Sequence, residues 1–378
     1  MSQPLAQRLG RLIRDAWHVL GIAILMLVCA ELLYRGQAAA RQALRGNPEL
    51  ERPPHPYDGQ SWWAEWQDGG ARWDMRFDPY RALWARPGVS KFITIDSEGR
   101  RVTFDAAPQV PKTTTVYMFG GSAMFGYTAR DRYTIPSIVS EELVRRGRPD
   151  VKVLNYGQST FNLTQEVNTL ILELRARRVP SVAVFMDGNN EIAPPFQSGR
   201  VGSILNEDQL AGRLVGPGRG FADLVMSQLL LARRLVQAVQ PPVEPFLGDE
   251  KLCPEIAEQY VALTDVVRAL GREFGFDSIH FWQPMYATTK KPPTAWEQTI
   301  SSAPRWRETV VACTNAVDRL VRTRAVTDFH SLNDLFDRET SSVFLDDYGH
   351  IVEEGNRVVA AAIVDRIIDR LPSSEVHR

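Results

Sequence analysis

The sequence lacks an excess of charge of either sign. Its 378 residues include 44 Lys and Arg against 45 Asp and Glu, so the formal net charge is −1 with neutral histidines. The basic residues are scattered singly and form no clustered positive footprint of the kind that a nucleic-acid-binding surface requires. We therefore exclude nucleic-acid binding and expect no nucleic acid among the partners.

Cysteine is also scarce. The three cysteines are Cys29, Cys253 and Cys313, and none has the CxxC or Cys/His spacing of a zinc site. We expect neither a metal nor a cofactor. If the body of the chain is exported, Cys253 and Cys313 can form a disulfide in an oxidising compartment. Two separate buried thiols fit the sequence equally well.

Long apolar runs are absent except for one near the N-terminus. Residues 16–34, AWHVLGIAILMLVCAELLY, are almost wholly apolar. At ~1.5 Å per residue they cross most of a ~30 Å hydrocarbon core. Residues 1–15 contain Arg8, Arg11 and Arg14, which favours a cytoplasmic N-terminus and a single-pass signal anchor.

This anchor predicts a protein of the inner (cytoplasmic) membrane, with the bulk of the chain on its periplasmic or extracytoplasmic side. Arginines also follow the run, at Arg35, Arg41 and Arg45, so the charge asymmetry is poor. Glu31 and Arg35 have the spacing of an ion pair at the membrane interface. Small residues at 38–40 keep a cleaved signal peptide as the alternative to an uncleaved anchor.

Two further segments precede the main domain. Residues 35–56 contain a Pro-rich stretch and are interpreted as a spacer. Residues 57–110 hold five of the nine tryptophans, and 91–104 alternate around Ser97-Glu98-Gly99 as an edge β-hairpin does. Packing of these tryptophans onto the domain is favoured over stacking on sugar rings. The five are Trp62, Trp63, Trp66, Trp73 and Trp84.

From 111 to 371 strand-like and helix-like segments alternate, before a short tail at 372–378. The expected strands are 113–119, 151–156, 181–186, 278–283 and 326–329, and the expected helices are 134–146, 163–178, 222–239, 255–274, 305–323 and 354–371. Repeated βα units predict a parallel sheet with helices on both faces. Functional sites of such sheets lie outside the carboxyl ends of the strands.

Small and polar residues follow three of these strands. They are Gly120-Gly121-Ser122, the stretch 155–159 and the stretch 187–191. A serine at a strand-to-helix turn exposes its hydroxyl beside outward-pointing N–H groups. Before the last helix, Asp347-x-x-His350 has the spacing at which a carboxylate orients an imidazole. Asp347 is favoured over Asp346, which points away if the approach is extended.

These blocks resemble those of the SGNH (GDSL-like) hydrolase superfamily, in their order along the chain. Gly-Gly-Ser122 is similar to the first block, although Gly121 replaces the usual Asp. Gly157 matches the second block, Gly188-x-Asn190 the third, and Asp347-x-x-His350 the last. The resemblance covers about 113–371. It implies a flavodoxin-like three-layer α/β/α domain with a mainly parallel five-stranded sheet, behind one transmembrane helix.

The resemblance and the chemistry assign the same roles. Ser122 is the nucleophile, His350 its general base and Asp347 the residue that orients His350. The N–H groups of Ser122 and Gly157 and the side-chain amide of Asn190 form the oxyanion hole. Glu191 is expected to hydrogen-bond a loop.

The sequence thus predicts a membrane-anchored, exported serine esterase acting on carboxylic esters, with O-acetyl groups of a cell-envelope or exported polysaccharide as the expected substrate. An O-acyltransferase with the same site is one alternative, and a non-catalytic polysaccharide-binding assembly factor is another. Lys290 and Lys291 lie in a long rim loop, where a solvated charged loop is favoured over contact with an anionic glycan. Protein partners are not predicted.

Overall fold

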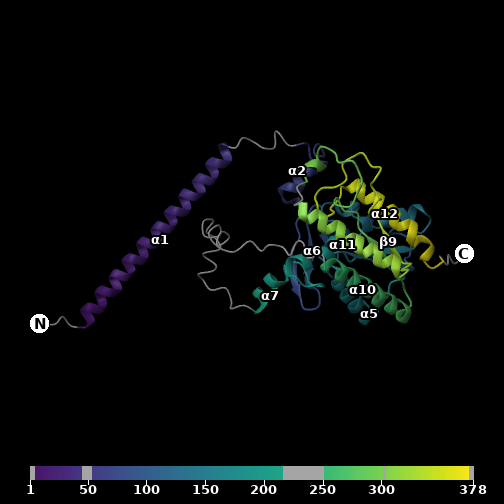
Figure 1. Cartoon of the computed structure of the whole chain (residues 1–378), viewed down its shortest axis with the longest axis horizontal. Helices are drawn as coiled ribbons and strands as arrows, with labels where there is room; N and C mark the ends of the chain where they lie inside the picture. The colour runs from purple at the N-terminus through teal and green to yellow at the C-terminus, as the bar shows by residue number, and fades with distance from the viewer. Residues whose placement is uncertain (1–4, 45–52, 216–250, 301–303, 374–378) are drawn as a thin grey trace. The chain divides into compact units, whose positions relative to one another are not determined.

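The computed structural model describes residues 5–44, 53–215, 251–300 and 304–373. The chain divides into two compact units, one of residues 1–52 and 209–244 and the other of residues 53–208 and 245–378. The helix expected at 222–239 lies outside the described residues, as do parts of the N-terminus, spacer and tail (Figure 1). Each unit is considered by itself.

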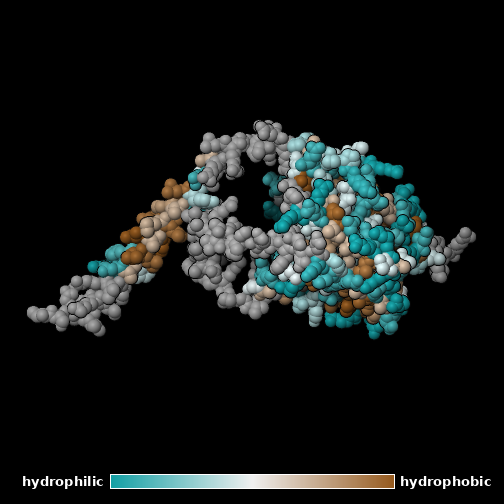
Figure 2. Space-filling model, viewed as in Figure 1, coloured by the Kyte–Doolittle hydropathy of each residue, from teal (hydrophilic) through white to brown (hydrophobic). Residues whose placement is uncertain are grey.

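The first unit contains α1 (Leu5–Leu44). Within it, the segment Arg14–Gln37 contains an 18-residue window with a mean hydropathy of 2.1, and its apolar side chains form a hydrophobic band (Figure 2). This segment is long and apolar enough to cross a membrane, and an N-terminal signal sequence would meet the same criteria. Arg35 Nε lies 2.7 Å from Glu31 Oε1, which is the ion pair that their spacing predicts.

A five-stranded sheet forms the centre of the second unit. Its strands are β5 (Thr114–Gly120), β6 (Val151–Asn155), β7 (Val182–Asp187), β8 (Asp277–Trp282) and β9 (Phe329–Ser331). Their order is β6-β5-β7-β8-β9, and all neighbours are parallel. The edge strand β6 is the second strand of this sheet along the chain, and its neighbour β5 is the first. This is the flavodoxin-like order. The predicted sheet is confirmed.

Helices cover both faces of this sheet. These helices are α3 (Ser122–Phe125), α4 (Ile135–Arg145), α5 (Leu163–Arg175), α6 (Asn189–Ser198), α10 (Leu252–Phe274), α11 (Pro304–Thr323) and α12 (Glu353–Ile367). Short 3₁₀ turns connect other segments: η3 (Asp131–Tyr133), η4 (Glu297–Thr299) and η5 (Ile368–Arg370). Helix α7 (Glu207–Val215) contains the point in the sequence where the two units divide. Tyr117 and Phe119 pack with α5, α10 and α11, whereas Val116 and Met118 pack with α4 and α12. Alternate residues of one strand therefore build two cores, because successive side chains point to opposite faces. The three-layer architecture is confirmed.

Local sequence signals define where the helices begin. The side chain of Asn162 accepts the N–H of Gln165, and the Gln165 side chain accepts the N–H of Asn162, forming a capping box for α5. Thr134 caps α4 in the same manner through the N–H of Ser137, and Pro136 lies in the first turn. Such caps stabilise a helix by about 1 kcal/mol and fix its first residue. The N-terminus of α5 is thereby held below the sheet rim.

The segment before the domain packs against it. It contains α2 (Trp63–Glu65), the π-helical turn η2 (Trp66–Gly70), an antiparallel pair β1 (Met75–Asp78) and β2 (Ala82–Ala85), and a second pair β3 (Gly88–Val89) and β4 (Thr94–Ile95). Trp62 lies in a cluster with Phe125 of α3 and with Val352, the residue before α12, so it packs on the part of the unit that contains the sheet. Trp63, Trp66 and Trp73 are partly buried against the same cluster.

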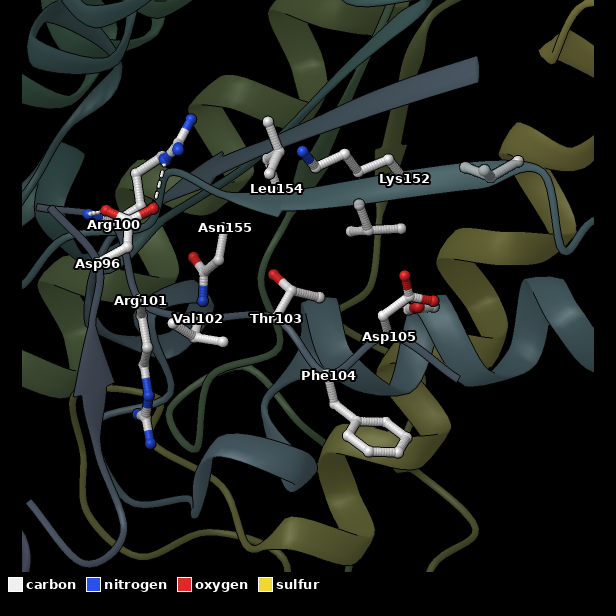
Figure 3. A pocket seen from close by; sticks show the side chains of 13 residues that line it. Asp96, Arg100, Arg101, Val102, Thr103, Phe104, Asp105, Lys152, Leu154 and Asn155 are labelled. Atoms are coloured by element: carbon white, nitrogen blue, oxygen red, sulfur yellow. Dashed lines mark hydrogen bonds and ion pairs between the residues drawn. The ribbon is translucent and has the colours of Figure 1, made fainter. Parts of the chain in front are cut away.

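The hairpin expected at 91–104 is shorter than predicted. Ile95 bridges Arg101 across a turn at 96–100, and Arg101 also bridges Asn155 at the end of β6. The residues that follow Arg101 run beside β6, where Asp96, Arg100 and Lys152 line a small hollow (Figure 3). The ribbon therefore borders the edge of the sheet at its carboxyl end.

A disulfide joins Cys253 of α10 to Cys313 of α11, 60 residues apart in the chain. Both residues are buried where these two helices pack together. Cys29 is free. The crosslink ties together two of the helices that cover this face of the sheet.

We expect the double variant Cys253→Ser, Cys313→Ser to unfold more easily than the parent chain. A crosslink that closes a loop of this length stabilises a fold by ~4 kcal/mol, which corresponds to a fall of ~10 °C in Tm. Thermal unfolding followed by circular dichroism measures this. Cys29→Ser is the matched control. An unchanged Tm in the double variant would show that the crosslink does not stabilise the domain.

Candidate active site

The turn that carries Ser122 has no room for side chains on its two glycines. A Cβ on Gly120 would lie 2.6 Å from Met124 Cβ, and one on Gly121 would lie 2.2 Å from Asn190 Nδ2. Both distances are shorter than Cβ contacts in proteins allow. The glycines therefore permit β5 to end and α3 to begin within two residues, which places Ser122 at the first position of the helix.

His350 is hydrogen-bonded to Ser122. Its Nε2 lies 2.7 Å from Ser122 Oγ, although the residues are 228 positions apart in the chain. Its Nδ1 lies 2.5 Å from Asp346 Oδ2. Asp346 Oδ1 accepts the N–H groups of Tyr348 and His350, at 3.0 and 3.2 Å. The structure thus brings together a serine, a histidine and a carboxylate in the order required for nucleophilic catalysis.

The carboxylate at Nδ1 is Asp346, and the sequence prediction of Asp347 is wrong. That prediction assumed an extended approach to His350. Instead, Leu345 N donates to His350 O at 2.9 Å and Gly349 has φ +88°, so the intervening residues form a tight turn. Within a turn, an aspartate at the first corner folds back over the following backbone N–H groups. Neutral imidazole has one N–H to donate, and here it faces Asp346.

A buried ion pair holds the base of this turn. Phe344 and Ile351 form an antiparallel bridge that closes the turn. Glu297 Oε1 accepts the N–H groups of Val343 and Phe344, at 2.9 and 3.1 Å. Lys291 Nζ lies 2.5 Å from Glu297 Oε2, and both side chains are almost fully buried. Lys291 is therefore not a solvated loop residue as the sequence suggested, and it fixes the strand that leads to Asp346.

Arg101 has a corresponding role on the nucleophile side. Its guanidinium is fully buried and donates to the carbonyls of Phe125, Gly126 and Ala129, immediately after α3. It also donates from Nε to Asp131 Oδ1 at 2.9 Å. These bonds fix the loop that continues from Ser122. No signal in the sequence distinguished Arg101 from the other arginines of this segment.

Two of the three predicted oxyanion donors have a fitting position. Ser122 N–H lies in the first turn of α3, where a helix supplies no acceptor of its own. Asn190 Nδ2 lies against the Gly121 backbone and gives one hydrogen to Phe161 O at 2.7 Å, leaving a second.

Gly157 is placed differently from the prediction. Its N–H donates to Asn155 Oδ1 at 2.8 Å, so this donor is engaged within its own loop. A Cβ at this position would lie 2.4 Å from Phe125 N, so the glycine is required for contact with α3. The prediction that its N–H belongs to the oxyanion hole is wrong.

Two further ionisable residues lie near the strand ends. Glu191 Oε1 accepts the N–H of Leu163 at 2.6 Å, which is the loop-binding role expected of it. His280 is fully buried and stacks on Phe185, with 4.8 Å between ring centroids. Burial lowers the pKa of His280 to about 4, so it is a neutral core residue.

Comparisons with known proteins give distant structural similarity only. No protein-family model matches the chain, and no curated protein of similar sequence was found. Among solved structures, the acetyl xylan esterase AlAXEase is similar over 67% of this chain and 99% of its own, with 13% identity and a TM-score of 0.39. The lipase/acylhydrolase from Enterococcus faecalis matches 70% of this chain and 100% of its own, with 12% identity and a TM-score of 0.37. An acetylxylan esterase from Geobacillus stearothermophilus matches 68% and 95%, with 10% identity and a TM-score of 0.38.

Similarity at this level carries no argument about activity. The resemblance to SGNH hydrolases rests instead on this chain's own strand order and on the meeting of Ser122, His350 and Asn190 at one rim.

The two neighbouring aspartates provide a matched test of the site. We expect Asp346→Asn to lower kcat by on the order of 10³–10⁴-fold, because an amide does not hold the imidazole in the required tautomer. Asp347→Asn is expected to change kcat by less than about threefold. Hydrolysis of p-nitrophenyl acetate measures both. A larger loss in Asp347→Asn would restore Asp347 as the orienting residue.

Proposed function

We propose that this chain is a serine esterase of the SGNH type, which cleaves carboxylic esters. The observation that supports this most directly is the hydrogen-bonded series Asp346, His350 and Ser122. In the reaction His350 Nε2 takes the proton of Ser122 Oγ as the oxygen attacks the ester carbonyl. The same proton then passes to the leaving alcohol, and the acyl group stays on Ser122.

Water completes the cycle in a second step of the same kind. His350 removes a proton from water, which attacks the acyl carbonyl and releases the carboxylic acid, and Ser122 Oγ regains its proton. In both steps the carbonyl oxygen becomes negatively charged. We propose that the N–H of Ser122 and the free amide hydrogen of Asn190 bind this oxyanion, where one donor contributes ~10²–10³ in kcat.

We further propose that the chain is an uncleaved single-pass protein of the inner membrane with its second unit on the extracytoplasmic side. The apolar segment of α1 and the arginines before it support this orientation. The disulfide between α10 and α11 is consistent with it, because disulfides persist in oxidising compartments.

The proposed substrate is an O-acylated glycan. A hollow of about 540 Å³ is lined by Arg72, Trp73 and Arg86, among others. The Trp73 ring lies 5.3 Å from Tyr127, and the Tyr127 ring stacks on His350 with 4.9 Å between centroids. Tyr127 is 42% exposed. Sugar rings pack on aromatic faces, and arginines donate hydrogen bonds to their oxygens, so this run of rings suits a glycan that extends away from His350.

Covalent labelling tests the esterase proposal directly. We expect a fluorophosphonate probe to label the intact chain, because the activated Ser122 attacks phosphorus as it attacks a carbonyl. Ser122→Ala is expected to abolish labelling, and His350→Ala to reduce it strongly. Labelling that persists in Ser122→Ala, or that is absent from the parent chain, would contradict the proposal.

A second test separates the recognition of a glycan substrate from the cleavage of the ester. We expect Arg72→Gln and Arg86→Gln together to raise KM for an acetylated oligosaccharide by about tenfold, the equivalent of ~1.4 kcal/mol, without altering p-nitrophenyl acetate kinetics. Arg76→Gln, an exposed arginine outside the hollow, is the matched control. Equal effects on both substrates would exclude the hollow as a glycan subsite. Acyl transfer to an added sugar acceptor, in place of acid release, would indicate the transferase.

A further inference from the structure

Two carboxyl groups are buried together below the Asn190 turn. Glu166 of α5 is fully buried, and Asp187 at the end of β7 is 4% exposed. Neither oxygen of Glu166 has a donor among the described residues, and the same holds for Asp187 Oδ1. Nor is any group of three or more His, Cys, Asp or Glu in this part of the chain arranged to hold a metal ion. A proton shared between the two carboxyl groups would pair one oxygen of Glu166 with Asp187 Oδ1.

The surroundings place that proton on Glu166. Burial and the neighbouring carboxylates of Asp187 and Glu191 raise the pKa of Glu166 well above its usual value. Burial raises the pKa of Asp187 to about 7, while hydrogen bonds from Glu166 and Tyr260 act in the opposite direction. Tyr260 of α10 donates to Asp187 Oδ2 at 3.3 Å, and its own pKa is raised by burial, so it stays a donor. Glu191, from α6, completes the ionisable groups that face the pair.

The pair connects the two turns that flank the oxyanion position. The turn at the start of α5 and the turn at the start of α6 are joined by two further bonds, Asn190 Nδ2 to Phe161 O at 2.7 Å and Leu163 N to Glu191 Oε1 at 2.6 Å. The side chains of Glu166 and Asp187 interact across the same two segments, so a proton between them would make a third connection. It lies where β7 ends, three residues before Asn190.

We propose that Glu166 donates its proton to Asp187, and that this buried pair is a positioning device that keeps Asn190 beside Ser122. The inference rests on the proposed function only in the part that concerns turnover. Loss of the proton leaves two negative charges side by side, where no described residue supplies a counter-charge, and they repel. The turns at the starts of α5 and α6 then separate, and the Asn190 amide leaves the oxyanion position.

The expected pH dependence follows from the direction of these shifts. An acid whose pKa is higher in the folded than in the unfolded state stabilises the fold at low pH, and this contribution is lost as pH rises through the folded value. We therefore expect Tm to fall between pH 6 and pH 9. The kcat should fall over the same range, by up to about tenfold per pH unit above the apparent pKa, with little change in KM.

The test compares Glu166→Gln with the parent chain, because glutamine keeps a donor and a similar shape but does not titrate. Steady-state kinetics with p-nitrophenyl acetate, corrected for spontaneous hydrolysis, and thermal unfolding are measured on the full chain from pH 6 to pH 9. We expect the parent to lose kcat and Tm toward pH 9, and Glu166→Gln to lose clearly less of both relative to its own value at pH 6, because only one negative charge can then form at the pair. Glu173→Gln, on the same helix but paired with Arg178, is the control and should behave as the parent does.

The proposal is overturned if the parent shows no alkaline fall in Tm, or if Glu166→Gln shows the same fall in kcat and Tm as the parent. A change confined to KM would also contradict it. If Glu166→Gln does not fold, Asp187→Asn is measured in its place; Glu166 still titrates there, but the repulsion between two carboxylates is absent, so a smaller alkaline fall in kcat and Tm than in the parent is expected, and an equal fall overturns the proposal. The Tm measurement needs no turnover, so its result is independent of whether Ser122 is labelled by the fluorophosphonate probe.

Discussion

The active site depends on close contacts at two glycines in the turns that follow β5 and β6. A Cβ on Gly121 would collide with the side-chain amide of Asn190, and one on Gly157 would collide with the backbone of Phe125 in α3. The turns after β5, β6 and β7 can therefore pack this closely only because these two positions lack a side chain. Only in that arrangement can a hydroxyl at the start of α3 and an amide at the start of α6 face the same small volume. The surrounding structure keeps these segments in place.

Much of the fold is readable from the sequence because it depends on local patterns. Each sheet strand is a short apolar run bounded by turn residues, and observed strands begin and end within a few residues of the expected positions. Ser122 was found by the same reasoning, since parallel strands bring their carboxyl ends to one rim. His350 was found from its spacing to an aspartate before the last helix and from the family resemblance, and it does lie beside Ser122. These inferences need only the spacing of apolar residues along the chain and the fixed handedness of βα connections.

The residues that were misassigned depend on geometry finer than these patterns. Asp346 and Asp347 differ by one position, and the choice between them is set by whether the chain before His350 is extended or turned; Gly349, with its positive φ, was the available signal for a turn. Gly157 was predicted as an oxyanion donor, whereas its N–H bonds Asn155 and its missing side chain allows close packing on α3. Arg101 gave no signal, because its importance arises from carbonyl groups that only the folded loop assembles.

Buried ionisable groups hold the two sides of Ser122, and they respond to pH in opposite directions. On the base side, burial acts to raise the pKa of Glu297, but hydrogen bonds from Lys291 and from the N–H groups of the catalytic turn outweigh it and lower that pKa. This contribution to stability is present at neutral pH and is lost on acidification. On the oxyanion side, Glu166 and Asp187 hold a proton that is lost on alkalinisation. Burying such ionisable groups costs several kcal/mol unless each is paired. Their presence on both sides of Ser122 indicates that a few hydrogen bonds and ion pairs set the positions of the catalytic groups. Acid therefore weakens the support on the base side, and the proposed loss of the shared proton weakens it on the oxyanion side.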